Sequence, residues 1–361
     1  MILHLTGAVV LRGTDHPEAW VADGRLALAA PAGPADLEVE GVILPGLVDV
    51  HCHVGLGERG AVSREEAEAQ ALADRATGVL LIRDAGVPSD TRWIDARADL
   101  PRIVRAGRHI ARPRRYLPGF AEELDDVASL PGAMARNARA GDGWVKLVAD
   151  WIDRSEGADS RVRPLWPADV LADGVAAAHE AGARVTAHAF SHEAIDPLLE
   201  AGIDCIEHGT GMDADQIAEA ARRGIPVTPT MIQVDNFADF AAAGGRRYPR
   251  YAEQMRAMWE RRDAQLRAFH EAGVQLLPGS DAGGTIPHGS LPAELARWVA
   301  GGIPAADVVA LATWRARDFL GAGTLGEGEP ADLVVYDNDP RDDITALARP
   351  RAVVLRGAVV G

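Results

Sequence analysis

The sequence predicts an α/β protein built as a (β/α)8 TIM barrel, with a small β-sandwich-like domain formed by both chain ends. Short apolar runs that suit strands buried on both faces alternate with helical stretches along the middle of the chain. Eight such runs occur over roughly 250 residues, which is the number and length that a (β/α)8 barrel requires. The two chain ends differ, because they carry short strand-like segments without long helices between them. The same alternation also permits a doubly wound open sheet, so periodicity alone leaves both folds open.

The expected barrel strands follow helical segments that end in glycine, a residue that suits the left-handed backbone at helix ends. Most of these runs finish in polar residues. The eight barrel strands are expected at residues 45–52, 79–83, 102–106, 144–148, 184–188, 204–208, 226–230 and 274–281. The stretch 236–272 is longer than an ordinary crossover and predicts an additional helix.

The two chain ends resemble each other more than they resemble the middle. Short strand-like segments occur at 2–5, 8–11, 26–28 and 42–44, and again at 331–336 and 351–355. Strands of both ends therefore predict one small β domain assembled beside the barrel. The expected division is residues 1–44 plus 322–361 for the small domain and 45–321 for the barrel.

Charge and composition exclude several classes of partner. The chain has 361 residues, 37 basic and 53 acidic, and a net charge of -16, which argues against nucleic acid or an anionic membrane as partner. Two cysteines cannot build a disulfide framework, and no apolar run reaches about 18 residues. With no signal peptide recognisable, we expect a cytoplasmic protein that acts on a small molecule.

Lys146 is the only lysine among the 37 basic residues. One interpretation is a leftover surface residue in a chain whose codon usage favours arginine. The other is that this position needs a primary amine, because a buried ammonium group can lose its proton whereas a guanidinium group stays protonated. The location of Lys146 within the expected strand 144–148 makes the second interpretation worth testing.

Histidines and an aspartate occur at the ends of several expected strands. On the first barrel strand, alternation directs His51 and His53 to one side and Cys52 to the other. The carboxyl ends of barrel strands converge on one face, where catalytic residues gather. Imidazoles and a carboxylate suit Zn²⁺ or a similar ion, although histidines can also simply pack at a barrel mouth. The converging residues are expected to be His51, His53, Lys146, His188, His208 and Asp281.

Several motifs together resemble the amidohydrolase superfamily, in particular the binuclear members with a carboxylated lysine and, among these, the imidazolonepropionase-like and Xaa-Pro dipeptidase-like group. The resemblance spans nearly the whole chain. It is carried by PGLVDVHCH (45–53), IRDAG (82–86), GWVKLVAD (143–150), TAHAFSHEAI (186–195), IEHGT (206–210), PGSDAG (278–283), PHGSLPAEL (287–295) and GTLGEGEPADLVVYDNDP (323–340).

The resemblance implies two divalent metal ions, expected to be Zn, and a metal-bridged hydroxide that attacks a C–N bond. It implies that His51, His53 and Asp281 hold the first ion, that His188 and His208 hold the second, and that carboxylated Lys146 bridges both. Asp281 would also shuttle the proton. Dipeptides (including Xaa-Pro), N-acyl amino acids and cyclic amides are the expected substrates, and the resemblance allows a homo-oligomer. Two alternatives stay open: an aldolase-type enzyme with a Schiff base on Lys146, and a catalytically silent relative.

The loop after the third expected strand departs from the family pattern. Many dipeptidase-like relatives have a Gly-Gly-His-Gly type loop there, whereas this chain has residues 108–119 with several arginines and Tyr116. Arginines grip carboxylates bidentately, so this segment is either an anion-recognising edge or a solvated basic turn. A long tryptophan-containing loop at 149–167 suggests an apolar wall. The candidate substrate-binding residues are His109, Arg115, Tyr116, Trp151, His192 and His288.

Overall fold

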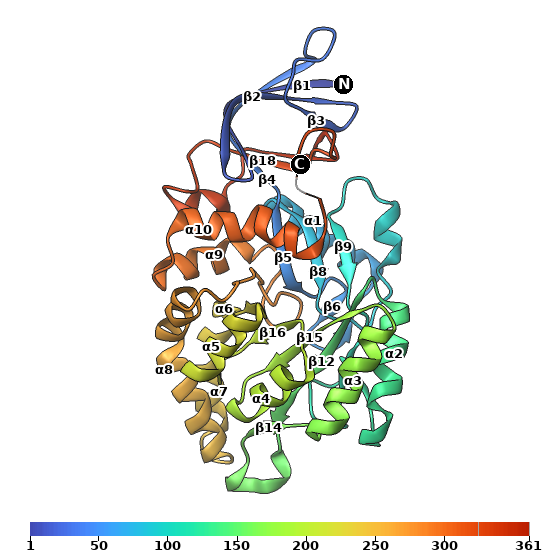
Figure 1. The fold of residues 1–361 in the computed structure, drawn as a ribbon, viewed down its shortest axis with the longest axis vertical. Helices are drawn as coiled ribbons and strands as arrows, with labels where there is room; N and C mark the ends of the chain where they lie inside the picture. The colour runs from blue at the N-terminus through green and yellow to red at the C-terminus, as the bar shows by residue number, and fades with distance from the viewer. Residues whose placement is uncertain (324, 361) are drawn as a thin grey trace.

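The computed structural model describes residues 1–323 and 325–360, so Thr324 and Gly361, both within the predicted small domain, lie outside the described residues. The core is a (β/α)8 barrel whose strands run parallel (Figure 1). One arc contains β5 (Leu47–Cys52), β8 (Val79–Asp84) and β9 (Arg102–Arg105). The other contains β11 (Ala121–Glu123), β10 (His109–Ala111), β12 (Trp144–Val148), β15 (Arg184–Ala189), β16 (Cys205–His208) and β17 (Val227–Thr228).

The eighth expected strand closes the barrel as an irregular segment at residues 274–282. The Leu277 amide donates to the Val227 carbonyl at 2.9 Å on one side, and the Asp281 amide donates to the His51 carbonyl at 2.8 Å on the other. A Cβ atom on Gly279 would lie 2.5 Å from the Cβ of His51, so only glycine lets this segment approach β5 so closely. The segment therefore joins β17 to β5.

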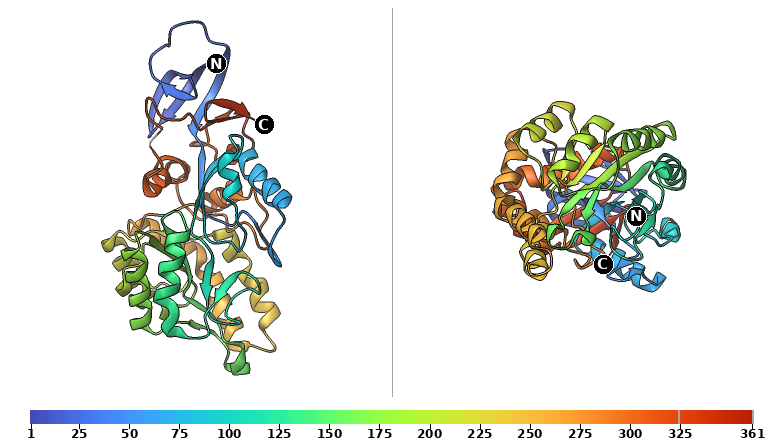
Figure 2. Two further views of the ribbon diagram at one scale, coloured as in Figure 1. Left: turned by 90° about the vertical axis from the view of Figure 1, so that its right-hand side faces the viewer. Right: turned by 90° about the horizontal axis from the view of Figure 1, so that it is seen from below.

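Helices surround the barrel, as the views from the side and from below show (Figure 2). Leucine, isoleucine, valine and alanine side chains from helices and strands form the main core between the two layers. The expected additional helix within 236–272 is confirmed as two helices, α7 and α8. The α-helices are α1 (Arg64–Ala76), α2 (Leu130–Ala140), α3 (Ala168–Glu180), α4 (His192–Ala201), α5 (Ala214–Arg223), α6 (Met231–Asp235), α7 (Phe237–Gly244), α8 (Pro249–Glu271), α9 (Leu291–Ala300), α10 (Ala305–Ala310) and α11 (Ala316–Leu320).

Shorter elements connect these helices and strands. A hairpin of β6 (Leu56–Gly57) and β7 (Gly60–Ala61) follows β5, and a second excursion consists of β13 (Asp150–Ile152), η3 (Arg154–Asp159) and β14 (Val162–Pro164). The remaining single turns are η1 (Arg92–Ala96), η2 (Val127–Ser129), η4 (Leu311–Arg315) and η5 (Ile344–Ala348). Both excursions lie next to the pocket described below, which they help to line.

Both chain ends contribute to one seven-stranded sheet above the barrel (Figure 1). In sheet order its strands are β20 (Ala358–Val360), β19 (Ala352–Leu355), β18 (Leu333–Tyr336), β4 (Leu37–Pro45), β1 (Ile2–Leu11), β2 (Thr14–Ala22) and β3 (Arg25–Ala27). The sheet has its own apolar cluster, separate from the main core. The sequence did not indicate β2 and β20, whose residues are largely exposed and alternate weakly. The domain division at 44/45 and 321/322 stays a prediction.

None of the described helices is both long enough and apolar enough to cross a bilayer.

Candidate metal centre

The first group of candidate ligands joins β5 to the closing segment of the barrel. His51 lies on β5 and His53 directly follows its last residue, and, as strand alternation predicts, both face the same carboxylate; both are buried. The Oδ1 atom of Asp281 lies 3.0 Å from His51 Nε2 and 3.2 Å from His53 Nε2. One ligand atom from each of these three residues lies within 4.8 Å of the other two. The structure thus brings together the set expected to hold the first ion.

A backbone contact fixes the orientation of His53. Its Nδ1 atom lies 2.8 Å from the Gly86 carbonyl, which can only accept, so Nδ1 donates this hydrogen bond and the ring presents Nε2 to Asp281. Asp84 in turn accepts the Gly86 amide at 2.7 Å and shapes this turn. The motif IRDAG thereby positions a histidine on the neighbouring strand, which is the supporting contact that metal-bound histidines usually have.

His188 and His208 form the opposite side of the group, at the ends of β15 and β16. Their ring centroids lie 4.8 Å apart. His208 Nδ1 lies 2.6 Å from Thr230 Oγ1, which leaves Nε2 directed elsewhere. His188 Nε2 is buried without a hydrogen-bond partner among the described residues, 3.6 Å from Asp150 Oδ1. An unpartnered buried nitrogen of this kind indicates a site made for a further group.

Lys146 is completely buried inside the barrel, which excludes the interpretation of a surface leftover. Its ammonium group donates to Glu207 Oε2, and Glu207 Oε1 accepts from Thr186 Oγ1 at 2.7 Å. The nearest other cation is Arg83, whose Nη2 atom lies 3.9 Å from Glu207 Oε1. The charge of Lys146 is therefore balanced inside the site by the buried carboxylate of Glu207.

Glu207 is the site residue that the sequence reasoning missed. Together with His51 and His208 it forms a second group whose ligand atoms lie within 4.8 Å of one another. Burial by itself raises the pKa of Glu207, but His51, Lys146 and Arg83 together lower it to about 2, so the carboxylate is ionised. The sequence feature that could have identified Glu207 is an acidic residue inside a strand predicted to be buried. Glutamate is rarely buried without a partner, so such a position indicates a buried polar site.

The electrostatics of the group suit a divalent cation. Burial lowers the pKa of His51, and it lowers the pKa values of His188 and His208 well below the ordinary range, so the His188 and His208 imidazoles are neutral with free lone pairs. Burial alone would raise the pKa of Asp281, but the neighbouring His51 and hydrogen bonds from His51 and His53 hold it well below its usual value. Neutral nitrogens and ionised oxygens are the ligands that Zn²⁺ prefers, so the residues present fit metal ions.

Three non-glycine residues at the rim of the group adopt left-handed backbone conformations. The φ angles are 64° for His208, 45° for Thr230 and 57° for Asp281. Each such residue costs about 1–3 kcal/mol, a strain that concentrates at functional sites. The surrounding strands thus impose these side-chain directions at the expense of local stability.

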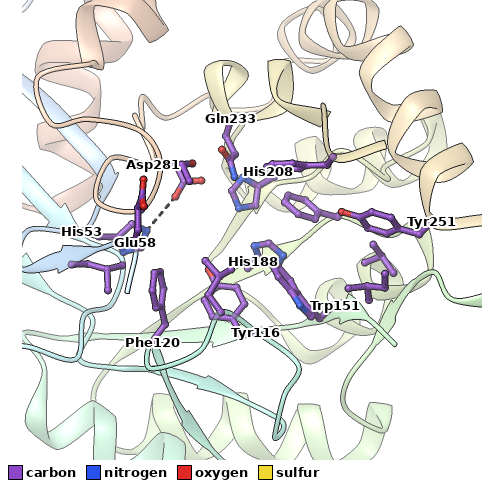
Figure 3. A pocket seen from close by; sticks show the side chains of 18 of the residues that line it. His53, Glu58, Tyr116, Phe120, Trp151, His188, His208, Gln233, Tyr251 and Asp281 are labelled. Atoms are coloured by element: carbon purple, nitrogen blue, oxygen red, sulfur yellow. Dashed lines mark hydrogen bonds and ion pairs between the residues drawn. The ribbon is translucent and has the colours of Figure 1, made fainter. Parts of the chain in front are cut away.

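A pocket of about 440 Å³ opens over the candidate ligands (Figure 3). Of the six candidate substrate-binding residues, Tyr116 and Trp151 line it. His109 is buried behind them, with ring centroids 5.2 Å from His53 and 5.1 Å from Tyr116. Arg115 points away, because it pairs with Asp153 and donates to the Ile152 carbonyl at 3.4 Å.

The last two candidates lie away from the pocket. His192 is the exposed first residue of α4, 3.7 Å from Asp213. His288 faces a neighbouring cavity, and its Nδ1 atom lies 2.8 Å from Asp74 Oδ2. Several residues that do line the pocket were not predicted as contacts, because they come from elements far apart in the chain that only the tertiary structure brings together. They are Leu56, Glu58, Phe120, Arg154, Phe190, Gln233, Phe240 and Tyr251.

A model of the amidohydrolase family matches residues 42–360. The chain belongs to the amidohydrolase family. An uncharacterized protein of Mycobacterium tuberculosis is 49% identical to this amidohydrolase over 342 residues, covering 95% of this chain and 91% of the relative. A 5-methylthioadenosine/S-adenosylhomocysteine deaminase of Halobacterium salinarum is 24% identical over 392 residues, covering 93% of this chain and 84% of the relative.

Solved structures share the fold of this amidohydrolase. A Xaa-Pro dipeptidase with bound methionine matches with a TM-score of 0.84 and 20% identity, over 100% of both chains. A prolidase complexed with N-methylphosphonate-L-proline matches with a TM-score of 0.81 and 24% identity, over 100% of this chain and 99% of the other. These likenesses agree with the (β/α)8 barrel.

Proposed function

We propose that this amidohydrolase is a metal-dependent hydrolase that cleaves the C–N bond of an amide or peptide. The observation that carries the proposal is the convergence of four buried histidines with ionised carboxylates beneath one pocket. Without a cation, buried nitrogens such as His51 Nδ1 and His188 Nε2 have no hydrogen-bond partner in the part of the chain that the structure describes. A catalytically silent relative would have no need to keep this arrangement.

We assign His51, His53 and Asp281 to one ion, His188 and His208 to a second, and Lys146, once carboxylated, to the bridge between them. Bound divalent ions, for which Zn²⁺ fits the donor set, would acidify a water molecule and polarise the amide carbonyl. The chain's own contribution is to hold the His53 and His208 rings in place through the Gly86 carbonyl and the Thr230 hydroxyl.

Asp281 is the proposed proton shuttle. It lines the pocket, and its carboxylate is ionised, so it can take a proton from the attacking water. The water oxygen forms the new bond to the carbonyl carbon, the C–N bond breaks, and Asp281 returns the proton to the leaving nitrogen. The products are a carboxylic acid and an amine, and the aspartate is regenerated.

The substrate class follows from the pocket walls, which are largely apolar and aromatic. Tyr116 lines the pocket with its ring centroid 4.8 Å from that of Trp151 and 5.7 Å from that of His188, and we assign its hydroxyl to a substrate oxygen. Dipeptides (including Xaa-Pro), N-acyl amino acids and cyclic amides are the substrates to test first. The prolidase and dipeptidase among the structural neighbours add weight to the dipeptides.

The test combines metal analysis with hydrolysis assays of the wild type and the variant Lys146→Arg. Arginine keeps the positive charge beside Glu207 but cannot take up CO2, so we expect the variant to lose both the bound metal and the activity. The wild type, purified without chelator, should contain about two metal ions per chain. Arg161→Gln, which changes an exposed residue paired with Glu193, serves as control and should keep both.

Two results would contradict the proposal. Metal-free wild-type protein that borohydride links covalently to a carbonyl substrate would favour Schiff-base chemistry on Lys146 instead. Full activity of Lys146→Arg with unchanged metal content would show that the amine is not needed.

A further inference from the structure

The pocket has two apolar lobes on opposite sides of the candidate ligands. Leu56 and Phe120 belong to one apolar cluster, on the side of His53. Phe190, Phe240 and Tyr251 belong to another, on the side of His188 and His208. Figure 3 shows Phe120 and His53 at one end of the pocket and Trp151 and Tyr251 at the other. A substrate whose reacting bond lies over the ligands must therefore place one part in each lobe.

A single negative charge lies in the first lobe. Glu58 occupies the tip of the hairpin between β6 and β7, in the segment that begins with His53 after β5. Its side chain lies at the same end of the pocket as His53 and Asp281 (Figure 3). The carboxylate forms no ion pair with any described residue. Among the described residues that line the pocket, the acidic ones are Glu58 and Asp281. The Asp281 carboxylate already contacts His51 and His53.

A single arginine lies in the second lobe. Arg154 begins η3, three residues after Trp151, and lines the pocket together with Tyr251. The other arginines around this excursion are all paired: Arg115 with Asp153, Arg161 with Glu193, Arg163 with Glu156 and Arg250 with Asp159. Within the described residues, Arg154 forms no ion pair and lines the pocket, so its guanidinium group is free to bind an anion.

We propose that Glu58 and Arg154 select an amide that carries an ammonium group on its acyl part and a carboxylate on its leaving amine. This inference rests on the proposed hydrolase function and specifies its substrate. The ammonium group pairs with Glu58, the carboxylate with Arg154, and the amide bond lies between them over the candidate ligands. A dipeptide held with its N-terminus toward Glu58 meets these conditions.

The lobes also specify the side chains of the dipeptide. The Arg154 lobe, with Trp151, Phe190, Phe240 and Tyr251, offers the larger aromatic surface, so the second residue carries an aromatic or large apolar side chain. The Glu58 lobe offers Leu56, Leu117 and Phe120 to the first residue. This assignment predicts that Ala-Phe is a better substrate than Phe-Ala.

The experiment measures kcat/KM for Ala-Phe, N-acetyl-Ala-Phe and Ala-Phe amide in the wild type and in the variants Glu58→Gln and Arg154→Gln. We expect the wild type to prefer the free N-terminus and the free carboxylate by about tenfold each, as one good charge-assisted contact gives. Glu58→Gln should abolish only the preference for the free N-terminus, and Arg154→Gln only that for the carboxylate. Both residues are exposed, so neither substitution should disturb folding.

The controls are Arg59→Gln in the same hairpin turn and Arg161→Gln in the same excursion, neither of which lines the pocket. Both controls should keep both preferences. If the dipeptides are hydrolysed but neither Glu58→Gln nor Arg154→Gln changes the kcat/KM preference for a free N-terminus or a free carboxylate, the roles of Glu58 and Arg154 are wrong. The hydrolase function would still stand.

A binding measurement separates failure of the assignment from failure of the hydrolase function. L-Phenylalanine, the expected leaving amino acid, should bind the wild type about tenfold more tightly than it binds Arg154→Gln, whereas L-phenylalaninamide should show a much smaller difference. If no amide is hydrolysed, the hydrolase function fails, and titration calorimetry with these two ligands still decides the role of Arg154. If Arg154→Gln weakened the binding of L-phenylalanine and L-phenylalaninamide equally, the assignment of Arg154 to the carboxylate would be wrong.

Discussion

At the scale of single residues, Glu207 balances the charges inside the barrel. In this structure its carboxylate accepts from the Lys146 ammonium group, and Arg83 lies 3.9 Å away. Arg83 is completely buried, it donates from Nε to the Val50 carbonyl, and its two terminal nitrogens have no hydrogen-bond partner among the described residues. Carboxylation would turn Lys146 from a cation into an anion, and Arg83 is the cation that remains to neutralise Glu207.

Removing this buried counter-charge should be costly. In metal-free protein, Glu207→Gln leaves Lys146 and Arg83 without a carboxylate, so we expect the free energy of unfolding to fall by about 3–5 kcal/mol. Adding Lys146→Met to this variant should restore a large part of the loss, because the unpaired ammonium group disappears. Urea denaturation of the two single variants and the double variant measures the coupling.

The matched control for that cycle is Glu193→Gln, which removes the partner of the exposed Arg161 at 3.7 Å. This substitution should cost less than about 1 kcal/mol, since exposed ion pairs contribute little. If Glu207→Gln lowered the free energy of unfolding by as little as the control does, the Lys146–Glu207 contact would not contribute to stability.

At the scale of elements, the loop after the closing segment is fastened to α1. His288 Nδ1 lies 2.8 Å from Asp74 Oδ2, and the Gly289 amide donates to Asp74 Oδ1 at 2.7 Å. Cys52, on the face of β5 opposite to His51 and His53, lies 3.6 Å from both side chains. His288, a candidate substrate contact by sequence, thus connects α1, β5 and the loop that follows Asp281.

This fastening should make stability depend on pH. Burial alone would lower the pKa of His288, but the Asp74 carboxylate raises it above the ordinary 6.5, so the folded protein holds this proton more tightly than the unfolded chain. The stability it contributes is fully present below pH 6.5 and is lost as the pH rises through the raised pKa. We therefore expect the difference in unfolding free energy between the wild type and His288→Gln to be largest below pH 6.5 and to shrink as the pH rises above it.

Thermal denaturation at several pH values checks this expectation, with His270→Gln as control. His270 also pairs with an aspartate, Asp307 at 3.2 Å, but it is half-exposed on α8. A difference between the wild type and His288→Gln that stays constant or grows with pH would contradict the assignment.

At the scale of the whole molecule, the candidate metal centre exists only when the barrel is closed. Its residues come from β5, β12, β15, β16 and the closing segment, and Asp49 on β5 accepts from the Ser280 hydroxyl at 2.6 Å across the closure. An unfolded chain cannot present these side chains together. Metal ions that bind the folded form alone should therefore stabilise it.

Removing metal should lower the melting temperature. A bound ion present at 100 times its dissociation constant contributes about 2.7 kcal/mol, which corresponds to a shift of several degrees in a chain of this size. Calorimetry before and after dialysis against a chelator should show the decrease, and added Zn²⁺ should reverse it. Chelated protein that has lost its metal but melts at an unchanged temperature would show that the centre does not hold metal in the folded state.

The sequence predicted most of the barrel, because apolar runs bounded by glycine and polar residues report burial directly. Val79, Trp144 and Arg184 begin strands where periodicity placed them. β2 escaped prediction because its side chains are mostly exposed and its strand is set by pairing with β1. The closing segment was expected as a regular strand but is held by isolated contacts around Pro278 and Gly279.

By itself, the sequence determined the (β/α)8 class, the family resemblance and the histidines and Asp281 at strand ends, since these depend on local pattern. Only the tertiary structure paired Lys146 with Glu207, placed Arg115 beside Asp153 and joined His288 to Asp74. It also left Glu58 and Arg154, beside the pocket, without an ion pair among residues 1–323 and 325–360. The physical reason is that ion pairing depends on the distance between side chains, and the barrel brings together residues that are far apart in the chain.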